Sequence, residues 1–114
     1  MIRKKLFIFT CLLFITTEIF ALDWTNMKQV QSVRVMNHGG FMVNLKDEEN
    51  TICTQAGSST ILFYPNQNGV TFNGAKSLLS TALIALTTGN KVNIMYSYSI
   101  DSGYCWGNAL LISK

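Results

Sequence analysis

Only one stretch of this chain has the pattern of an α-helix, and this limits the folds that the chain can adopt. Within roughly Ala75–Thr87, apolar residues recur at helical spacing, so we expect most of one side of the helix to be buried. These apolar residues are Leu78, Leu79, Ala82, Leu83, Ala85 and Leu86. Asn73 fits the N-cap, and Gly89 fits the stop at the C-terminal end. The rest of the fold must therefore come from strands.

Three predicted strands precede the helix as an antiparallel meander. Gln29–Met36 alternates, with Val33 and Val35 on one face, and a glycine-containing turn follows. The second strand, Phe41-Met42-Val43-Asn44-Leu45, is expected to point Phe41, Val43 and Leu45 inward. The third strand is predicted to open at Thr51–Thr54.

Ile61–Tyr64 is predicted as a short strand that stops at Pro65, because proline lacks the N–H that a strand ladder needs. Two more strands follow the helix: Lys91–Tyr98, with Val92, Ile94 and Tyr96 on one face, and Tyr104–Ser113. This order predicts a mainly β domain with one helix, an OB-like small five-stranded barrel. The alternative is an open antiparallel α+β sheet with the helix packed on one face.

Residues 1–21 have the pattern of a secretory signal peptide. A basic start, Arg3-Lys4-Lys5, precedes the apolar run Leu6–Ile15, and Ala21 offers a small residue at the cleavage point. The apolar run is shorter than the roughly 20 residues that span a bilayer. We therefore predict a cleaved leader and a single domain at residues 22–114 with no membrane span. The mature protein is expected to be secreted or periplasmic.

Loss of the leader changes the charge and the cysteine count. Residues 22–114 contain six basic and five acidic residues, so no basic surface suggests a nucleic-acid partner. Cys53 and Cys105 remain as the single pair in an exported chain, which predicts a disulfide between them. This closed loop would stabilise so small a domain by roughly 4 kcal/mol.

Cys105 lies in the stretch YCWGN, which raises the question of nucleophilic catalysis. A cysteine nucleophile needs a base, and the sole histidine, His38, lies in the glycine-rich turn. Two cysteines and one histidine fall short of a structural zinc set. The acids Asp47, Glu48 and Glu49 lack the spacing of an EF-hand loop. We expect no enzymatic activity, no metal site and no cofactor.

Aromatic and amide residues gather in the second half of the chain: Tyr64, Asn66, Tyr96, Tyr98, Tyr104, Trp106 and Asn108. Aromatic rings can pack on the apolar faces of sugars while amides bond to sugar hydroxyls, although ordinary strand packing accounts for such residues too. Tyr104 and Trp106 should point away from the side that Cys105 faces. Tyr104, Trp106 and Asn108 are therefore candidate ligand-binding residues.

Several stretches resemble the B subunits of the pertussis-like toxins, especially those of typhoid toxin and subtilase cytotoxin. These stretches are Asp23-Trp24-Thr25, the hairpin that leads into Phe41, Thr51-Ile52-Cys53, and Thr87-Thr88-Gly89-Asn90 followed by Lys91-Val92-Asn93-Ile94. The resemblance implies an OB fold, a homopentamer, binding to cell-surface glycans, and an enzymatic A subunit as partner.

The resemblance also adds Lys46 and Thr51 as candidate ligand-binding residues, which correspond to a lysine and a threonine of the family. Two features depart from the family. No serine lies between Trp24 and Val30 to match the one that takes part in sialic-acid binding. The family pairs its third-strand cysteine with one in the second strand, but residues 42–45 contain none.

The sequence therefore favours a secreted, non-enzymatic binding module whose partner is a cell-surface glycan. The alternative is a periplasmic structural or inhibitor-type domain that binds another protein through a strand edge.

Overall fold

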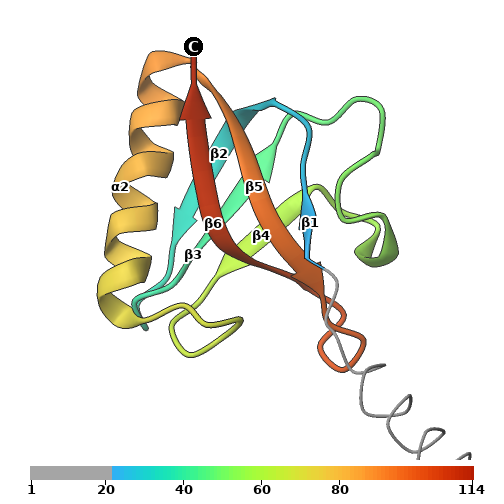
Figure 1. Ribbon diagram of the computed structural model, residues 1–114, viewed down its shortest axis with the longest axis vertical. Coiled ribbons are helices and arrows are strands. Elements are labelled where there is room, and N and C mark those ends of the chain that lie inside the picture. The colour runs from blue at the N-terminus through green and yellow to red at the C-terminus, as the bar shows by residue number, and fades with distance from the viewer. Residues whose placement is uncertain (1–21) are drawn as a thin grey trace, which may run out of the picture.

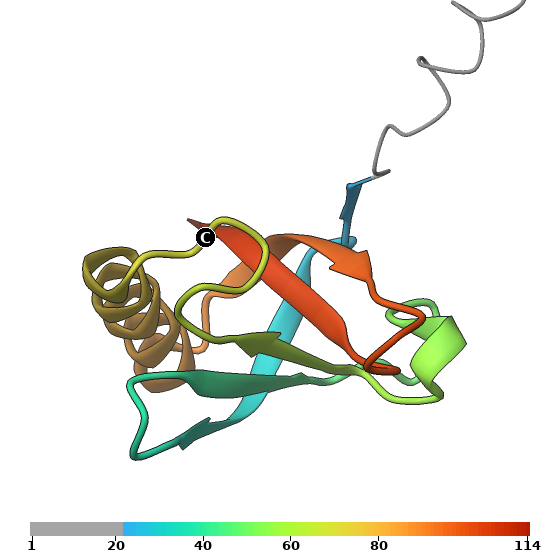
Figure 2. The same cartoon turned by 90° about the horizontal axis from the view of Figure 1, so that it is seen from below.

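The computed structural model describes residues 22–114 as a strand barrel with one helix (Figure 1). The predicted signal peptide, residues 1–21, lies outside the described residues. The long helix, α2 (Phe72–Thr88), runs along one side, and the short 3-10 helix η1 (Thr54–Ala56) lies on the opposite side (Figures 1 and 2). Within residues 22–114, no helix has both the length and the apolar character that a membrane crossing requires.

Five strands close into a barrel. They are β2 (Lys28–Val35), β3 (Phe41–Leu45), β4 (Thr60–Phe63), β5 (Lys91–Tyr98) and β6 (Cys105–Ser113). β2, β3 and β4 pair antiparallel in chain order, and β4 then pairs in parallel with β6 at Leu62 and Trp106. β6 pairs antiparallel with β5, which returns to β2 at Lys28 and Gln29. The prediction of an OB-like five-stranded barrel is confirmed, and the open-sheet alternative is wrong.

The alternating residues of two strands form most of the core, as predicted. Phe41, Val43 and Leu45 of β3 are at most 1% exposed, and the Phe41 ring stacks on Phe63 of β4 with ring centroids 4.9 Å apart. On β5, the predicted inward residues Val92, Ile94 and Tyr96 are buried. Period-two alternation therefore gives the correct inner face wherever a strand has neighbours on both edges.

Val33 and Val35 were predicted to share one face of the first strand, but the Val35 side chain is 59% exposed. β2 pairs with β5 only at Lys28 and Gln29, so β3 is the only strand that pairs with its second half among the described residues, and α2 packs against β2. Val30, near the start of β2, is buried at 8% exposure, and Val33 packs against the core at its edge. Val35 lies beyond the part of β2 that the barrel covers.

The prediction of a third strand at Thr51–Thr54 is also wrong. Cys53 has a left-handed backbone with φ of 50° and precedes η1, which extended pairing does not allow. The Asp47 carboxylate accepts a hydrogen bond from the Ile52 N–H at 2.8 Å, so the segment turns. The third strand of the meander is β4, the segment that was predicted as a separate short strand.

α2 begins and ends one turn or less outside the predicted limits. Its N-cap is Thr71, whose hydroxyl accepts from the Gly74 N–H at 2.9 Å, so the predicted cap at Asn73 is wrong. Gly89 ends the helix as predicted, with φ of 75°. The buried face consists of Ala75, Ala82 and Ala85, small residues that allow the helix to approach the barrel closely. Leu83 and Leu86 were expected to be buried but are 41% and 38% exposed.

The predicted disulfide is present between Cys53 and Cys105, whose Cα atoms lie 6.0 Å apart. Both cysteines are fully buried, and the bond ties the start of η1 to the first residue of β6. Such a bond indicates an oxidising, extracytoplasmic compartment.

A short strand, β1 (Asp23–Trp24), pairs with β5 at the outer edge of the barrel. The next residue, Thr25, anchors this segment: its N–H donates to the Ile94 carbonyl at 2.8 Å, and its hydroxyl accepts from the Ile94 N–H at 2.9 Å. Thr25 is 4% exposed, whereas the Trp24 side chain is 47% exposed. The start of the described chain is therefore fixed beside the β5–β6 hairpin.

Candidate functional site

Four aromatic side chains make edge contacts in a continuous row, which we name the aromatic ridge (His38, Tyr64, Trp106 and Tyr104). The ring centroids of His38 and Tyr64 are 4.4 Å apart, those of Tyr64 and Trp106 are 5.1 Å apart, and those of Trp106 and Tyr104 are 6.1 Å apart. All three pairs have the edge-on geometry that aromatic rings prefer. Tyr104 is 52% exposed and Trp106 is half-buried, so the ridge presents ring surface to solvent.

The backbone of β6 places Trp106 on the ridge. Cys105 points into the core to reach Cys53, so the residues on either side of it point outward. Gly107 is buried against β4, where an added Cβ would lie 2.5 Å from the Phe63 ring. Glycine at this position lets β6 lie close to β4, which brings Trp106 beside Tyr64.

Two side-chain hydrogen bonds hold the tryptophan in place. The Trp106 Nε1–H donates to the Ser102 hydroxyl at 3.0 Å, and the Asn68 amide donates to the Trp106 carbonyl at 2.8 Å. The polar edge of the indole is therefore already bonded, and its apolar face is the part left for a ligand. These bonds join the turn before α2 to the β5–β6 hairpin.

A cavity of about 790 Å³, the hairpin cavity, adjoins Trp106. Its lining combines an indole and a phenol with amides, hydroxyls and one carboxylate: Leu22, Gln67, Asn68, Ser97, Tyr98, Ser99, Ile100, Asp101 and Trp106. An aromatic wall with a few convergent polar groups is typical of a small-molecule or sugar site.

A second cavity of about 290 Å³, the sheet cavity, adjoins Tyr104. It is lined by Met42, Ala56, Ser58, Thr60, Leu62, Gly103, Tyr104 and Cys105. Met42 belongs to β3, Thr60 and Leu62 belong to β4, and Tyr104 closes the β5–β6 hairpin. In the OB fold, the second and third barrel strands and the loop between the last two strands form the usual ligand-binding face. The sheet cavity lies on this face.

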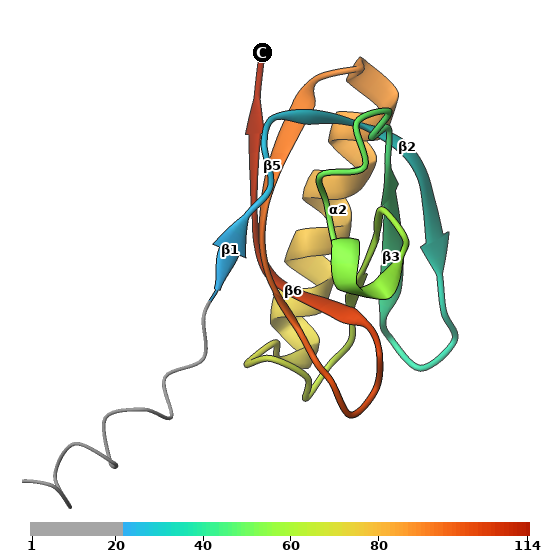
Figure 3. The same ribbon diagram turned by 90° about the vertical axis from the view of Figure 1, so that its right-hand side faces the viewer.

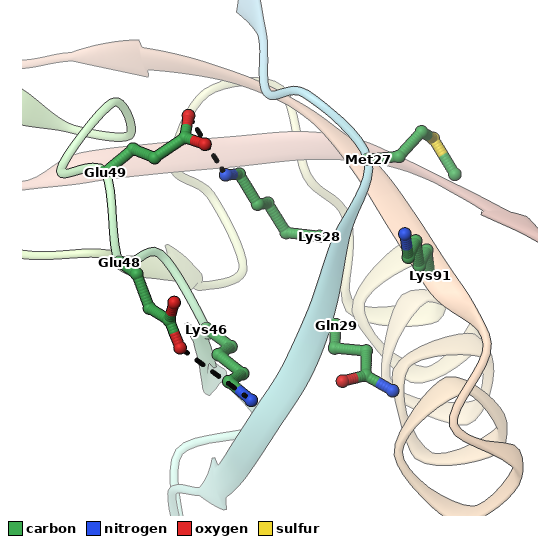
Figure 4. A pocket seen from close by; sticks show the side chains of 7 residues that line it. All are labelled: Met27, Lys28, Gln29, Lys46, Glu48, Glu49 and Lys91. Carbon is green, nitrogen blue, oxygen red and sulfur yellow. Dashed lines mark ion pairs between the residues drawn. The ribbon is translucent and has the colours of Figure 1, made fainter.

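A third cavity of about 310 Å³, the lysine cavity, lies at the other end of the barrel and is charged. It is lined by Met27, Lys28, Gln29, Lys46, Glu48, Glu49 and Lys91. Figure 4 shows the ion pairs between Lys28 and Glu49, at 4.0 Å, and between Lys46 and Glu48, at 3.9 Å. The loop that carries these acids and the β5–β6 hairpin lie at opposite ends of the barrel (Figures 1 and 3).

Asp47 organises the loop beside the lysine cavity. Its side chain is 0% exposed, and its carboxylate lies 3.5 Å from the Lys28 ammonium. It also accepts from the Thr51 hydroxyl at 3.1 Å and from the Ile52 N–H at 2.8 Å. Burial alone would raise the pKa of Asp47, but hydrogen bonds from Ile52, Thr51 and Lys28 outweigh it and hold the pKa below its ordinary value.

The predicted ligand-binding residues do not form one group. Tyr104 and Trp106 lie together on the aromatic ridge, as their spacing suggested. Asn108 lies further along β6, at a register shift, and its buried Oδ1 atom has no hydrogen-bond partner among the described residues. Lys46 lines the lysine cavity, and the Thr51 hydroxyl is bonded to Asp47.

Other residues in the aromatic and amide group have different places. Tyr64 joins the ridge, and Tyr98 lines the hairpin cavity. Tyr96 belongs to the core, where its hydroxyl accepts from the Cys53 N–H at 3.3 Å. Gln67 and Asn68 were not among the candidates identified from the sequence, although both belong to the amide-rich stretch NQNG before the helix.

The cysteine of YCWGN is not a free thiol, because Cys105 is bonded to Cys53. Nucleophilic attack requires a thiolate, so the oxidised residue cannot supply it. The His38 Nδ1 atom accepts from the Gly40 N–H at 3.2 Å and lies over Tyr64, at the far end of the ridge.

Comparison with models of known protein families, with curated proteins and with solved structures finds no match to this chain.

Proposed function

We propose that this protein is a secreted, non-enzymatic binding module that holds a glycan at the aromatic ridge. The observation that carries the proposal is the position of Trp106 and Tyr104 between two cavities, one of them rich in amides and hydroxyls. The fixed indole face suits the apolar face of a sugar ring. Gln67, Asn68 and the serines of the hairpin cavity provide donors and acceptors for sugar hydroxyls.

The resemblance to toxin B subunits supports the same class of ligand, a cell-surface glycan, and adds a homopentamer and an enzymatic A subunit to the proposal. The ligand face proposed here rests on the ridge alone. Lys46 and Thr51, which the resemblance added, line neither ridge cavity and are left out of the proposed site: Lys46 lines the lysine cavity, and the Thr51 hydroxyl is bonded to Asp47.

The two tryptophans of the chain, Trp106 and Trp24, provide the test and its control. Trp106→Ala should weaken binding to a glycan found on an array by at least about fivefold, because loss of an aromatic stacking surface costs on the order of 1–3 kcal/mol where nucleic-acid bases stack on it. Trp24→Ala removes an indole that is 47% exposed and lines neither cavity, so it should retain binding.

Melting curves of both variants show whether the barrel remains folded. If Trp106→Ala destabilises the barrel, Tyr104→Ala serves instead, because Tyr104 is 52% exposed. Equal binding by the wild type and by both ridge variants, or no binding of the wild type to any glycan, would contradict the proposal.

A second candidate function is protein binding through a strand edge. The far half of β2 pairs with no strand but β3 among the described residues, and Val35 on it is 59% exposed, although α2 packs against β2. An open strand edge can accept a strand from another chain. Native mass spectrometry of the mature protein separates this candidate from the toxin-like glycan-binding module: a pentamer supports the toxin-like assembly, whereas a strict monomer counts against it.

A further inference from the structure

The two cavities beside the aromatic ridge contain almost no charge. Among the described side chains that line the hairpin cavity, Asp101 alone is ionic, and the side chains that line the sheet cavity are all uncharged. The backbone N–H groups and hydroxyls there can bond to neutral groups, but no lysine or arginine lies at either cavity.

The basic residues of the described chain lie elsewhere. Lys28, Lys46 and Lys91 line the lysine cavity at the opposite end of the barrel. Lys28 and Lys46 are already paired there with acids of the loop after β3. None of the remaining basic residues, Arg34, Lys76 and Lys114, lines a ridge cavity.

Leu22 also lines the hairpin cavity, and its backbone amino group can change the total charge of that cavity. If the leader is removed after Ala21, as the sequence predicts, the new α-ammonium of Leu22 belongs to the same cavity as Asp101. One positive and one negative group then leave the cavity neutral, and the sheet cavity remains uncharged.

We propose that the ligand of the aromatic ridge is an uncharged glycan, and that Asp101 contributes to this selectivity. The inference rests on the proposed function and names the class of sugar. A sialic-acid carboxylate or a sulfate that entered either cavity would lose its hydration without a lysine or arginine to replace it. At the hairpin cavity the like charge of Asp101 would oppose the acid and offset the attraction of the Leu22 α-ammonium, so the acid would gain no net attraction there. Neutral hydroxyls, in contrast, can donate to the Asp101 carboxylate.

The experiment uses an array of matched glycans, each neutral oligosaccharide printed beside its sialylated and its sulfated derivative. The wild-type mature protein should bind neutral members at least about tenfold better than their acidic derivatives. Asp101→Asn keeps the size of the side chain and removes its charge, so the preference should narrow by about threefold or more.

Glu48→Gln is the matched control, because it makes the same charge change at the lysine cavity. It should leave the neutral-to-acidic preference unchanged. Stronger binding to the acidic derivatives by the wild type would overturn the inference while leaving glycan binding in place. Binding to no member of the array would overturn the proposed function and the inference together. A preference that both variants retain in full would overturn the role of Asp101.

Discussion

At one end of the barrel the charged side chains pair with one another, whereas at the other end polar groups hold aromatic rings in position. Asp47 and Lys28 form a pair that is 0% and 15% exposed, and the loop folds around it. At the β5–β6 hairpin, Ser102 and Asn68 bond to Trp106 and leave its ring face open. Ion pairs hold the loop at one end, and hydrogen bonds at the other end hold an indole whose ring face stays open.

This difference explains why charge alone is a poor guide to the site. The lysine cavity contains the largest group of ionic residues, yet those ion pairs stabilise the loop after β3. The hairpin cavity has a single carboxylate but more than twice the volume, at about 790 Å³ against 310 Å³. The proposed glycan needs ring faces and hydroxyl partners, and the hairpin end has both.

The largest effect is expected at the disulfide, which joins the charged loop to the start of β6. Replacing both cysteines, Cys53→Ser with Cys105→Ser, should lower the free energy of unfolding by about 4 kcal/mol, because the bond closes a long loop. The two residues are 52 positions apart. Urea denaturation under oxidising conditions measures the loss.

Reductant provides the control for this prediction. It should lower the midpoint of the wild type to that of the double variant and leave the double variant unchanged. Equal stability of the wild type and the double variant without reductant would show that the disulfide contributes nothing to the free energy of unfolding.

A smaller loss is expected from Asp47→Ala at the charged end. The substitution removes the acceptor of the Ile52 N–H and the partner of Lys28, which should cost about 1–3 kcal/mol. Glu48→Ala is the control, since its pair with Lys46 is exposed and should change stability by no more than about 0.5 kcal/mol. Similar losses of stability for the two variants would mean that the contacts of Asp47 stabilise the fold no more than the exposed ion pair of Glu48 does.

The effect of Asp47 should also depend on pH. Its pKa lies below the model-peptide value of 3.8 in the folded protein, so its carboxylate favours the folded state above that value. This contribution is lost as the pH falls through the lower, folded pKa. The stability difference between the wild type and Asp47→Ala should therefore be largest near neutrality and shrink in acid below about pH 4. A difference that grew in acid would contradict this assignment.

The sequence predicted the barrel because alternation and helical periodicity report burial directly. Phe41, Val43 and Ile94 follow that rule, and the cysteine pairing followed from having only two candidates. The prediction of a strand at Thr51–Thr54 was wrong for a local reason. The Ile52 N–H donates a hydrogen bond to the Asp47 side chain, so it does not pair with a neighbouring strand.

The candidate site was predictable only in part. Tyr104 and Trp106 were identified because residues two apart on a strand share a face. Their partners come from separate elements, Asn68 from the turn before α2, Ser97 from β5 and Asp101 from the β5–β6 turn, and only the closed barrel brings these elements together. The five candidates were separated because strand closure, which sequence patterns do not reveal, places Lys46 and Trp106 at different cavities and buries the Oδ1 atom of Asn108.

The smallest effect is expected from Lys46→Ala and Thr51→Ala, which test whether the charged end takes part in binding at all. Thr51 already donates to Asp47, and the Lys46 ammonium lies 3.9 Å from Glu48, so neither variant should change glycan affinity by more than about twofold. Isothermal titration with a glycan that binds the wild type measures this.

A large loss of glycan affinity in Lys46→Ala, together with full binding by Trp106→Ala, would show that the glycan binds at the lysine cavity and not at the ridge. In that case an acidic glycan would be the expected ligand, because Lys28, Lys46 and Lys91 would then supply the cations that the ridge lacks. The matched neutral and acidic pairs and the Lys46 variant therefore test the same distinction from two independent directions. Only an uncharged ligand bound at the ridge gives the expected result in both experiments.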